Sequence, residues 1–360
     1  MRICVIAGMI DDKLHAKIAP LQNMKEITQI HLIRRQPYAG DKIICHSPPE
    51  RIRRFLPLAE AWRFLTLLRM ALFPRPKVII AFGIVPHGVY AGWVGWLLRI
   101  RVIQHVMGKN DLRLTFRHQQ GRNVTLKAVK RGRLVAVRGE SMKEWLVERG
   151  IPEENIFIPQ NVHDFYHFRA KGPGDPEAIF DFVYVGLLSG YKRIDVMLDA
   201  LALARKSLPG LKLLLVGDGP KAAALTKKVK KLKLDDAVHF AGNRALKDLP
   251  DLLHSARIFL MTSQGEGLPQ AMLEAMSCGL PAIVPDDADI REVAVDGENA
   301  LLVDPPTVAG FAQAMVDLSQ NPHRLEVLTA GAQKIQHQYR QAWSLKHQTE
   351  VWQKAITSIL

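Results

Sequence analysis

The sequence has few cysteines and lacks any long apolar run. Three cysteines in 360 residues, at positions 4, 45 and 278, are too few for a disulfide framework, so we predict buried, reduced thiols. No Cys/His spacing typical of a zinc site occurs. The first residues lack the regions of a secretory signal, and no apolar stretch has the roughly 20 residues that span a bilayer. These absences predict a cytoplasmic globular protein.

The charge is distributed unevenly along the chain. Its length suits two domains, and its 49 basic and 35 acidic residues give a net charge of +14. Residues 1–170 contain 28 basic and 13 acidic residues, whereas residues 171–360 contain 21 and 22. The positive excess therefore belongs to the first half. A basic surface favours an anionic lipid, a phosphorylated acceptor or nucleic acid, and charge alone does not choose among them.

Short apolar runs alternate with longer helix-like stretches, which is typical of βαβ units around a parallel sheet. The predicted strands are Arg2–Ala7, Ile27–Ile33, Val78–Phe82, Arg101–Val106, Leu134–Val137, Phe182–Val185, Leu211–Val216, Ala237–Phe240, Ile258–Met261 and Ala282–Val284. A turn-rich segment, 171–176, predicts the domain boundary. We therefore predict an α/β protein with two doubly wound Rossmann-like domains, 1–170 and 171–340, that face each other across a cleft.

Two apolar stretches allow a membrane-surface interpretation. Leu58–Leu72 is rich in Leu and Phe and has arginines on both sides, and Gly88–Leu98 contains two tryptophans. In the first stretch Glu60, Arg63 and Arg69 fall on different faces of a helix, so the amphipathic pattern is weak. We interpret both stretches as ordinary packed helices and keep interfacial contact as the alternative.

The segment Ser263–Pro281 carries the most informative pattern. It follows a predicted strand, and Pro269 suits the first turn of a helix, where its missing N–H costs nothing. Gly279 suits the position just after the end of that helix. This strand–loop–helix arrangement directs helix amides to the carboxyl edge of a sheet, which favours an anion.

Glu266 lies in the predicted loop, and Glu274 lies more than one turn into the helix. Two glutamates separated by seven residues, within EGLPQAMLEAMSCGLP, resemble the family 4 glycosyltransferases, which are retaining enzymes of GT-B fold also called glycosyl transferases group 1. The resemblance implies that Glu266 contacts donor sugar hydroxyls and Glu274 the ribose of a nucleotide. It also implies that the backbone at Gly265, Gly267 and Leu268 approaches the diphosphate.

The segment Val185–Arg193 resembles the family's loop that binds the diphosphate. Its candidates are Gly186, the cationic Lys192 and its neighbour Arg193. Family members usually carry an arginine directly after the glycine, and this sequence has Leu187 there. Because a cation beside the leaving group stabilises developing charge, this departure bears on catalytic strength.

Three further positions are predicted from the resemblance. Gly217, in a turn after a predicted strand, and Gly242 match segments beside the nucleotide and its base. His105, at the end of the strand at 101–106, matches an active-site histidine, with a core histidine as the alternative. Asp286–Asp289 has the look of a metal cluster, but the family needs no catalytic metal. We predict no metal and no cofactor, only a UDP- or GDP-type sugar donor.

The implied reaction moves a sugar from a nucleotide-diphosphate sugar to an acceptor hydroxyl with retention, in cell-surface polysaccharide, lipopolysaccharide or glycolipid synthesis. The basic domain would bind a saccharide or lipid-linked saccharide, and the protein would contact the anionic inner face of the cell membrane peripherally. The last helix, in 341–360, would return to the first domain. The alternatives are a nucleotide-sugar epimerase of the same architecture and a non-catalytic nucleotide-sugar-binding protein, the latter suggested by Leu187. No sequence motif supports nucleic-acid binding.

Overall fold

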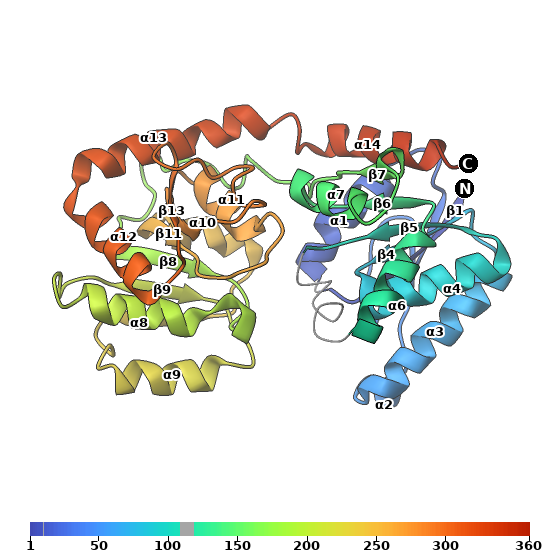
Figure 1. The fold of residues 1–360 in the computed structure, drawn as a ribbon, viewed down its shortest axis with the longest axis horizontal. Helices are drawn as coiled ribbons and strands as arrows, with labels where there is room; N and C mark the ends of the chain where they lie inside the picture. Colours follow the sequence, from blue (N-terminus) through green and yellow to red (C-terminus); the bar gives the residue numbers. More distant parts are fainter. Residues whose placement is uncertain (10, 109–118) are drawn as a thin grey trace. The chain divides into compact units, whose positions relative to one another are not determined.

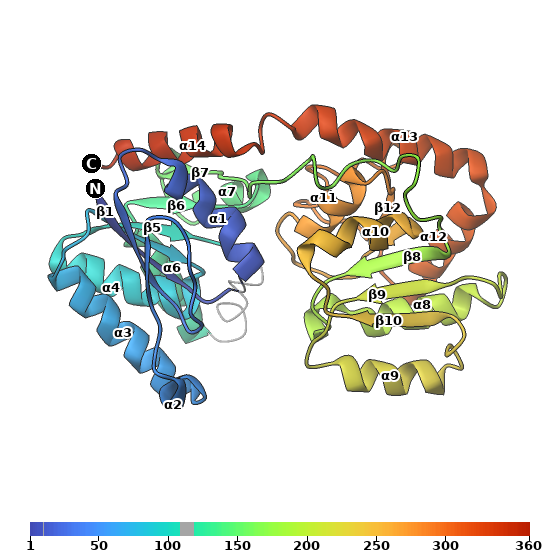
Figure 2. The same cartoon turned by 180° about the vertical axis from the view of Figure 1, so that it is seen from behind.

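The computed structural model describes residues 1–9, 11–108 and 119–360. The chain forms two compact units: unit 1 contains residues 1–163 and 341–360, and unit 2 contains residues 164–340 (Figures 1 and 2). The division falls a few residues before the turn-rich segment at 171–176. Within residues 164–170, Phe165, His167, Phe168 and Arg169 form hydrogen bonds with later residues of unit 2.

Unit 1 is built on a parallel sheet of seven strands in the order β3-β2-β1-β4-β5-β6-β7. Its strands are β1 (Arg2–Ala7), β2 (Gln29–Ile33), β3 (Ile43–His46), β4 (Val78–Phe82), β5 (Arg101–His105), β6 (Leu134–Ala136) and β7 (Ile156–Phe157). The central strand β1 alternates across the sheet: Ile3 and Val5 pack towards α1 and α14, whereas Cys4 and Ile6 pack towards α3 and α4. Burial raises the pKa of the Cys4 thiol to about 12.

Helices cover both faces of this sheet. The described helices of unit 1 are α1 (Asp11–Asn23), α2 (Glu50–Arg53), α3 (Leu56–Leu72), α4 (Val89–Leu98), α6 (Gln119–Lys130), α7 (Glu140–Val147) and α14 (Leu345–Thr357). Among the described residues, none of the helices combines the length and the apolar character that crossing a bilayer requires.

Helix α14 lies on unit 1 although it ends the chain. Trp352 is buried, and its ring lies 5.2 Å from that of Phe157 and 6.4 Å from that of Phe82. The Asn23 side chain donates to the hydroxyl of Thr349 at 3.0 Å. The last helix is thus one wall of the unit 1 core.

Unit 2 has a parallel sheet of six strands in the order β10-β9-β8-β11-β12-β13. Its strands are β8 (Phe180–Val185), β9 (Leu213–Val216), β10 (Val238–Gly242), β11 (Ala256–Leu260), β12 (Ala282–Pro285) and β13 (Ala300–Val303). Its helices are α8 (Ile194–Ala204), α9 (Ala222–Lys231), α10 (Leu249–His254), α11 (Gln270–Ser277), α12 (Val308–Gln320) and α13 (Pro322–Tyr339). Figure 2 shows α8 on one side of the sheet and α10 and α11 on the other.

All ten predicted strands are present, with ends shifted by no more than two residues, and the α/β class is confirmed. Three strands were not predicted: β3, β7 and β13. Each lies at an edge of its sheet and has only two to four residues. Because an edge strand pairs on one side only, it needs less continuous apolar sequence than a central strand.

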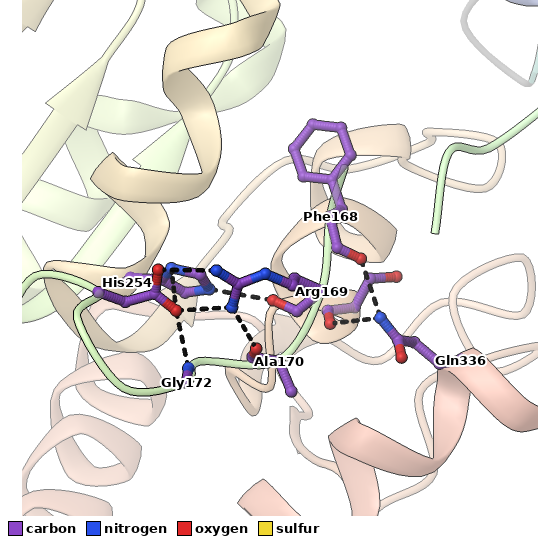
Figure 3. A network of polar contacts seen from close by, with 8 residues as sticks. Phe168, Arg169, Ala170, Gly172, His254 and Gln336 are labelled. Carbon is purple, nitrogen blue, oxygen red and sulfur yellow. Dashed lines mark hydrogen bonds and ion pairs between the residues drawn. The ribbon is translucent and has the colours of Figure 1, made fainter. Parts of the chain in front are cut away.

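A polar network fixes residues 164–175 to unit 2 (Figure 3). Arg169 donates to both carboxylate oxygens of Asp175, at 2.7 and 2.9 Å, and His254 lies against the Arg169 carbonyl at 3.0 Å. The Gln336 amide donates to the Phe168 carbonyl at 3.0 Å. The hydrogen bond from Arg169 lowers the pKa of Asp175 strongly. This network explains why the division of the chain precedes the turn at 171–176.

We expect Trp352→Ala to destabilise unit 1 by about 3–5 kcal/mol, because it removes a large buried ring and leaves a cavity. Chemical unfolding followed by circular dichroism measures the change. Lys354→Ala, at an exposed position of the same helix, serves as the control and should have little effect. A loss below about 1 kcal/mol for Trp352→Ala would show that α14 is not part of the core.

Candidate functional site

The candidate site lies in unit 2 at the point where the strand order reverses. Strand β8 pairs with β9 on one side and with β11 on the other. The connections after β8 and β11 therefore leave the sheet in opposite directions, and the carboxyl ends of these two strands form the usual ligand position of a doubly wound sheet. Both segments that the sequence singles out most strongly, 185–193 and 263–281, begin here.

The structure brings Lys192 and Glu266 together. The Lys192 ammonium forms an ion pair with the Glu266 carboxylate, and both side chains are largely buried. The hydroxyl of Thr262, which is completely buried at the end of β11, lies 3.1 Å from the Lys192 carbonyl and 2.9 Å from the Arg193 carbonyl. This shared hydrogen bond ties the loop after β8 to the end of β11 and holds the ion pair at the strand ends.

Three predicted glycines link the ends of β8, β9 and β10. Gly186 donates to the Val216 carbonyl at 2.9 Å, and Gly217 donates to the Gly242 carbonyl at 2.8 Å. Gly217 has φ +136°, and a Cβ atom there would lie 2.0 Å from the Gly186 carbonyl oxygen. Only glycine allows this approach of two backbones. Gly242, with φ +70°, has open space where a side chain would be.

The segment after β11 forms the predicted loop and helix. Gly265 has φ +68°, and α11 begins directly after Pro269. The helix ends at Ser277, and Gly279 follows with φ +86°, as predicted for a helix terminus.

The predicted donor residues on and before α11 lie at different depths. Leu268 is buried just before the helix, whereas Gly267 lies in the loop beside Glu266. Glu274 lies one turn into α11 and is buried. Burial and the neighbouring Glu274 carboxylate raise the pKa of the Cys278 thiol to about 12.

The position that usually carries the family's arginine is an uncharged surface position here. Leu187 is 48% exposed. Arg193 forms the N-terminal cap of α8 with φ 52°, and its Nη1 is buried without a hydrogen-bond partner. Of the two predicted cations, Lys192 and Arg193, Lys192 is therefore the one that forms an ion pair with Glu266.

The sequence did not single out several polar groups around this ion pair. The Tyr184 hydroxyl donates to the Leu187 carbonyl at 3.1 Å, and burial followed by the nearby Glu266 charge raises the pKa of that tyrosine. The buried hydroxyls of Ser189 and Ser263 have no protein hydrogen-bond partner. Ser189 lies in the segment 185–193 and Ser263 in the segment 263–281. Membership of these two motifs is the sequence signal that could have identified both serines.

His105, the predicted active-site histidine, belongs to unit 1. It ends β5 in unit 1, is 2% exposed, and its ring packs 5.2 Å from Phe82 and 6.3 Å from Trp352. Neither ring nitrogen has a hydrogen-bond partner. Burial, followed by the charges of Lys17 and Arg138, lowers its pKa well below the usual value. The structure therefore favours the alternative of a core histidine.

A different histidine lies where the strand order of unit 1 reverses, between β1 and β4. His87 follows β4, and a Cβ atom on Gly8, just after β1, would lie 2.6 Å from the His87 ring. Burial, followed by the charge of Arg63, lowers the pKa of His87 to about 4. Its ring is therefore neutral at pH 7.

The acidic segment at 286–289 is a turn stabilised from within. Asp286 forms an ion pair with Arg291, and the Asp287 carboxylate accepts from the Asp289 amide at 3.1 Å. Among the described residues, one group of three possible metal ligands lies close together: Asp175, Asp251 and His254. Arg169 already binds both oxygens of Asp175, and His254 belongs to the network shown in Figure 3.

Comparisons with known proteins agree with this geometry. Residues 169–335 match the family model described as Glycosyl transferases group 1. The Bacillus subtilis protein "Putative glycosyltransferase EpsD" is 25% identical over 321 residues, which are 88% of this chain and 77% of that protein. The lipopolysaccharide 1,6-galactosyltransferase of Escherichia coli is 29% identical over 178 residues, which are 47% of this chain and 48% of that enzyme.

The crystal structure of Anabaena Alr3699/HepE in complex with UDP-glucose has the same fold. Its TM-score is 0.79 at 18% identity, over 99% of this chain and all of the other. Two doubly wound sheets in one chain, with this structural likeness, show the GT-B fold. The sequence matches support a glycosyltransferase. The match to the group 1 glycosyltransferases covers residues 169–335, which lie within unit 2.

We expect His105→Phe to keep or raise the thermal stability at pH 7, because a ring of similar size replaces two unpartnered buried nitrogens. The folded-state pKa of His105 lies below that of the unfolded chain, so stability is lost as the pH falls below about 6.5. The variant should lose less stability over that range than wild type does. Thermal scans from pH 7 to pH 5 test this, with the exposed His323→Phe as the control. A folded His105→Phe protein without transferase activity would contradict a core role.

Proposed function

We propose that the protein transfers a sugar from a nucleotide-diphosphate sugar to an acceptor hydroxyl with retention of configuration. The observation that carries the proposal is the Lys192–Glu266 ion pair where the strand order of unit 2 reverses, beside the start of α11. An ammonium and the amides at the start of a helix suit a diphosphate, and a carboxylate suits sugar hydroxyls. Unit 2 would thus bind the donor, and unit 1 the acceptor.

Each predicted residue has a separate part in this proposal. Lys192 and the backbone at 265–268 stabilise the negative charge that develops on the departing diphosphate. Glu266 binds the sugar hydroxyls, and Glu274 binds the ribose. Gly186, Gly217 and Gly242 keep the strand ends open to the nucleotide. The buried hydroxyls of Ser189 and Ser263 would donate to donor oxygens and so gain the partners that they lack in the protein.

The proposed reaction needs no protein nucleophile. The acceptor hydroxyl attacks the anomeric carbon on the side from which the diphosphate leaves, and a leaving phosphate oxygen accepts its proton. The carbon–oxygen bond to the phosphate breaks as the bond to the acceptor forms. The nucleotide-diphosphate sugar is of UDP or GDP type, and the proposal assigns no role to a metal ion.

The excess of basic residues in 1–170 supports the proposal that the acceptor is a saccharide or a lipid-linked saccharide. Such an acceptor would belong to cell-surface polysaccharide, lipopolysaccharide or glycolipid synthesis. The names of the polysaccharide and lipopolysaccharide relatives are consistent with such an acceptor. We also propose a cytoplasmic location with peripheral contact to the anionic inner face of the cell membrane. An epimerase would need no acceptor and no paired glutamates, and is not favoured.

We expect Glu274→Ala to weaken nucleotide binding about 10- to 100-fold, since it removes a charged hydrogen-bond acceptor for the ribose. A thermal-shift screen of nucleotide sugars first identifies the donor, because a bound ligand raises the unfolding temperature. Calorimetry with that donor then compares Glu274→Ala and Glu274→Gln with Glu326→Ala, an exposed control on α13. Unchanged affinity in folded Glu274 variants would disprove the ribose assignment.

Leu187→Arg should tighten binding of the donor diphosphate about tenfold or more, because it restores a cation that can bind phosphate with two hydrogen bonds. Calorimetry with the nucleoside diphosphate measures the effect. Leu203→Arg, at an exposed position of α8, adds the same charge away from the strand ends and should leave the affinity unchanged. Equal gains in the two variants would mean that the effect is only one of net charge.

A further inference from the structure

The outward face of α3 is apolar. Leu58, Leu65 and Leu72 are spaced by seven residues and therefore lie on one side of the helix, and each keeps more than half of its surface exposed. Ala61 and Arg69 are the other exposed residues along this side. One arginine and four apolar residues thus make up the face that a soluble helix usually fills with charge.

Two of the three charged residues of α3, Glu60 and Arg63, point the other way. Arg63 is buried, donates to the Ala7 carbonyl at 3.3 Å, and forms an ion pair with Glu60. This explains why the sequence pattern is weakly amphipathic. The prediction of an ordinary packed helix is correct for the inner side of α3, formed by residues such as Leu67 and Met70, and does not account for the outer one.

Helix α4 extends this apolar area. It lies beside α3 in Figures 1 and 2, and the rings of Phe64 and Tyr90 join the two helices at 5.3 Å. Its exposed residues include Trp93, Trp96 and Leu97, each at least half exposed. The two indole rings lie 6.0 Å apart, edge to face.

Two phenylalanines flank α3. Phe55 precedes the helix and Phe73 follows it, and both are strongly exposed. We call these residues together the apolar face of unit 1: Phe55, Leu58, Leu65, Leu72, Phe73, Trp93, Trp96 and Leu97. Exposed apolar patches of this extent mark an interaction site.

Basic residues surround this face. Residues 50–101 contain nine basic residues and only two acidic ones. The two acids, Glu50 and Glu60, are ion-paired with Arg54 and Arg63. The guanidinium of Arg131 lies 4.1 Å from the centre of the Trp93 ring. The exposed basic residues of 50–101 and of the segment after α6 include Arg51, Arg54, Arg69, Arg75, Lys77, Arg99 and Arg133.

We propose that the apolar face of unit 1 docks on an anionic lipid bilayer, with α3 and α4 lying in the headgroup layer. Tryptophans, leucines and arginines on one surface match the composition of interfacial helices, and the arginines would meet lipid phosphates. A second copy of the chain is a poorer occupant, because a symmetric contact would bring the same ring of arginines against itself. The inference rests on the proposed peripheral membrane contact and names the surface that makes it.

Co-sedimentation with vesicles tests the proposal. The full chain is mixed with vesicles of phosphatidylcholine alone, or of phosphatidylcholine with phosphatidylglycerol, at low and high salt. We expect binding to the anionic vesicles that weakens with salt, and a blue shift of tryptophan fluorescence on binding. Trp93→Ala/Trp96→Ala and Leu58→Ser/Leu65→Ser should each reduce binding at least tenfold. Arg69→Glu/Arg99→Glu should reduce binding to the anionic vesicles by about fivefold or more per arginine.

Ile179→Ser, which removes an exposed apolar residue of unit 2, is the matched control and should bind as wild type does. If both apolar double variants still bind vesicles, the apolar face of unit 1 is not the docking surface, although the protein still contacts membranes. A wild-type chain that ignores vesicles and forms a dimer lost in Trp93→Ala/Trp96→Ala would overturn the proposal in favour of a second copy. Calorimetry with the donor nucleotide separates the two proposals. If the surface variants bind the nucleotide as wild type does, their loss of vesicle binding concerns the membrane surface alone. If wild type does not bind the nucleotide, the transferase function is contradicted and the membrane proposal is not.

Discussion

One buried hydroxyl group holds the candidate site of unit 2 together. Lys192 and Glu266 come from connections that leave the sheet in opposite directions, so chain continuity does not bring them into contact. Thr262 bridges the two connections by its bond to the carbonyls of Lys192 and Arg193. Because this bond is buried, it is not weakened by competing water. The positions of the ammonium and the carboxylate both depend on it.

The glycines of the neighbouring strand ends give the site its second constraint. The backbones at Gly186 and Gly217 approach so closely that any side chain at Gly217 would collide with a carbonyl oxygen. The Tyr184 hydroxyl holds the carbonyl of Leu187, so the loop is fixed through its backbone. The side chain of residue 187 can therefore vary without changing the path of the chain. This explains how the usual arginine can be replaced by leucine while the loop is retained.

In unit 1, the helices that cover the sheet determine which side chains are buried and which face solvent. His105 ends β5 and His87 follows β4, but only His87 lies where the strand order reverses. The helix α14 covers His105 with the Trp352 ring. On the opposite face of the sheet, α3 turns its ion pair inward and Leu58, Leu65 and Leu72 outward. On α3, an apolar side chain is therefore not necessarily buried, and a charged side chain is not necessarily exposed.

The sequence by itself determined the α/β class, the central strands, and the loop and helix that carry Glu266 and Glu274, because continuous apolar runs, glycines and a proline encode local structure directly. It missed three of the four edge strands, β3, β7 and β13, since these are short and half of their pairing groups face no neighbour. Only the tertiary structure decided that His105 is buried, that Thr262 joins two distant loops, and that three leucines of α3 face outward. Each of these facts depends on what a second, sequence-distant element covers, and hydrophobic pattern records only that a residue is apolar, not which neighbour removes it from water.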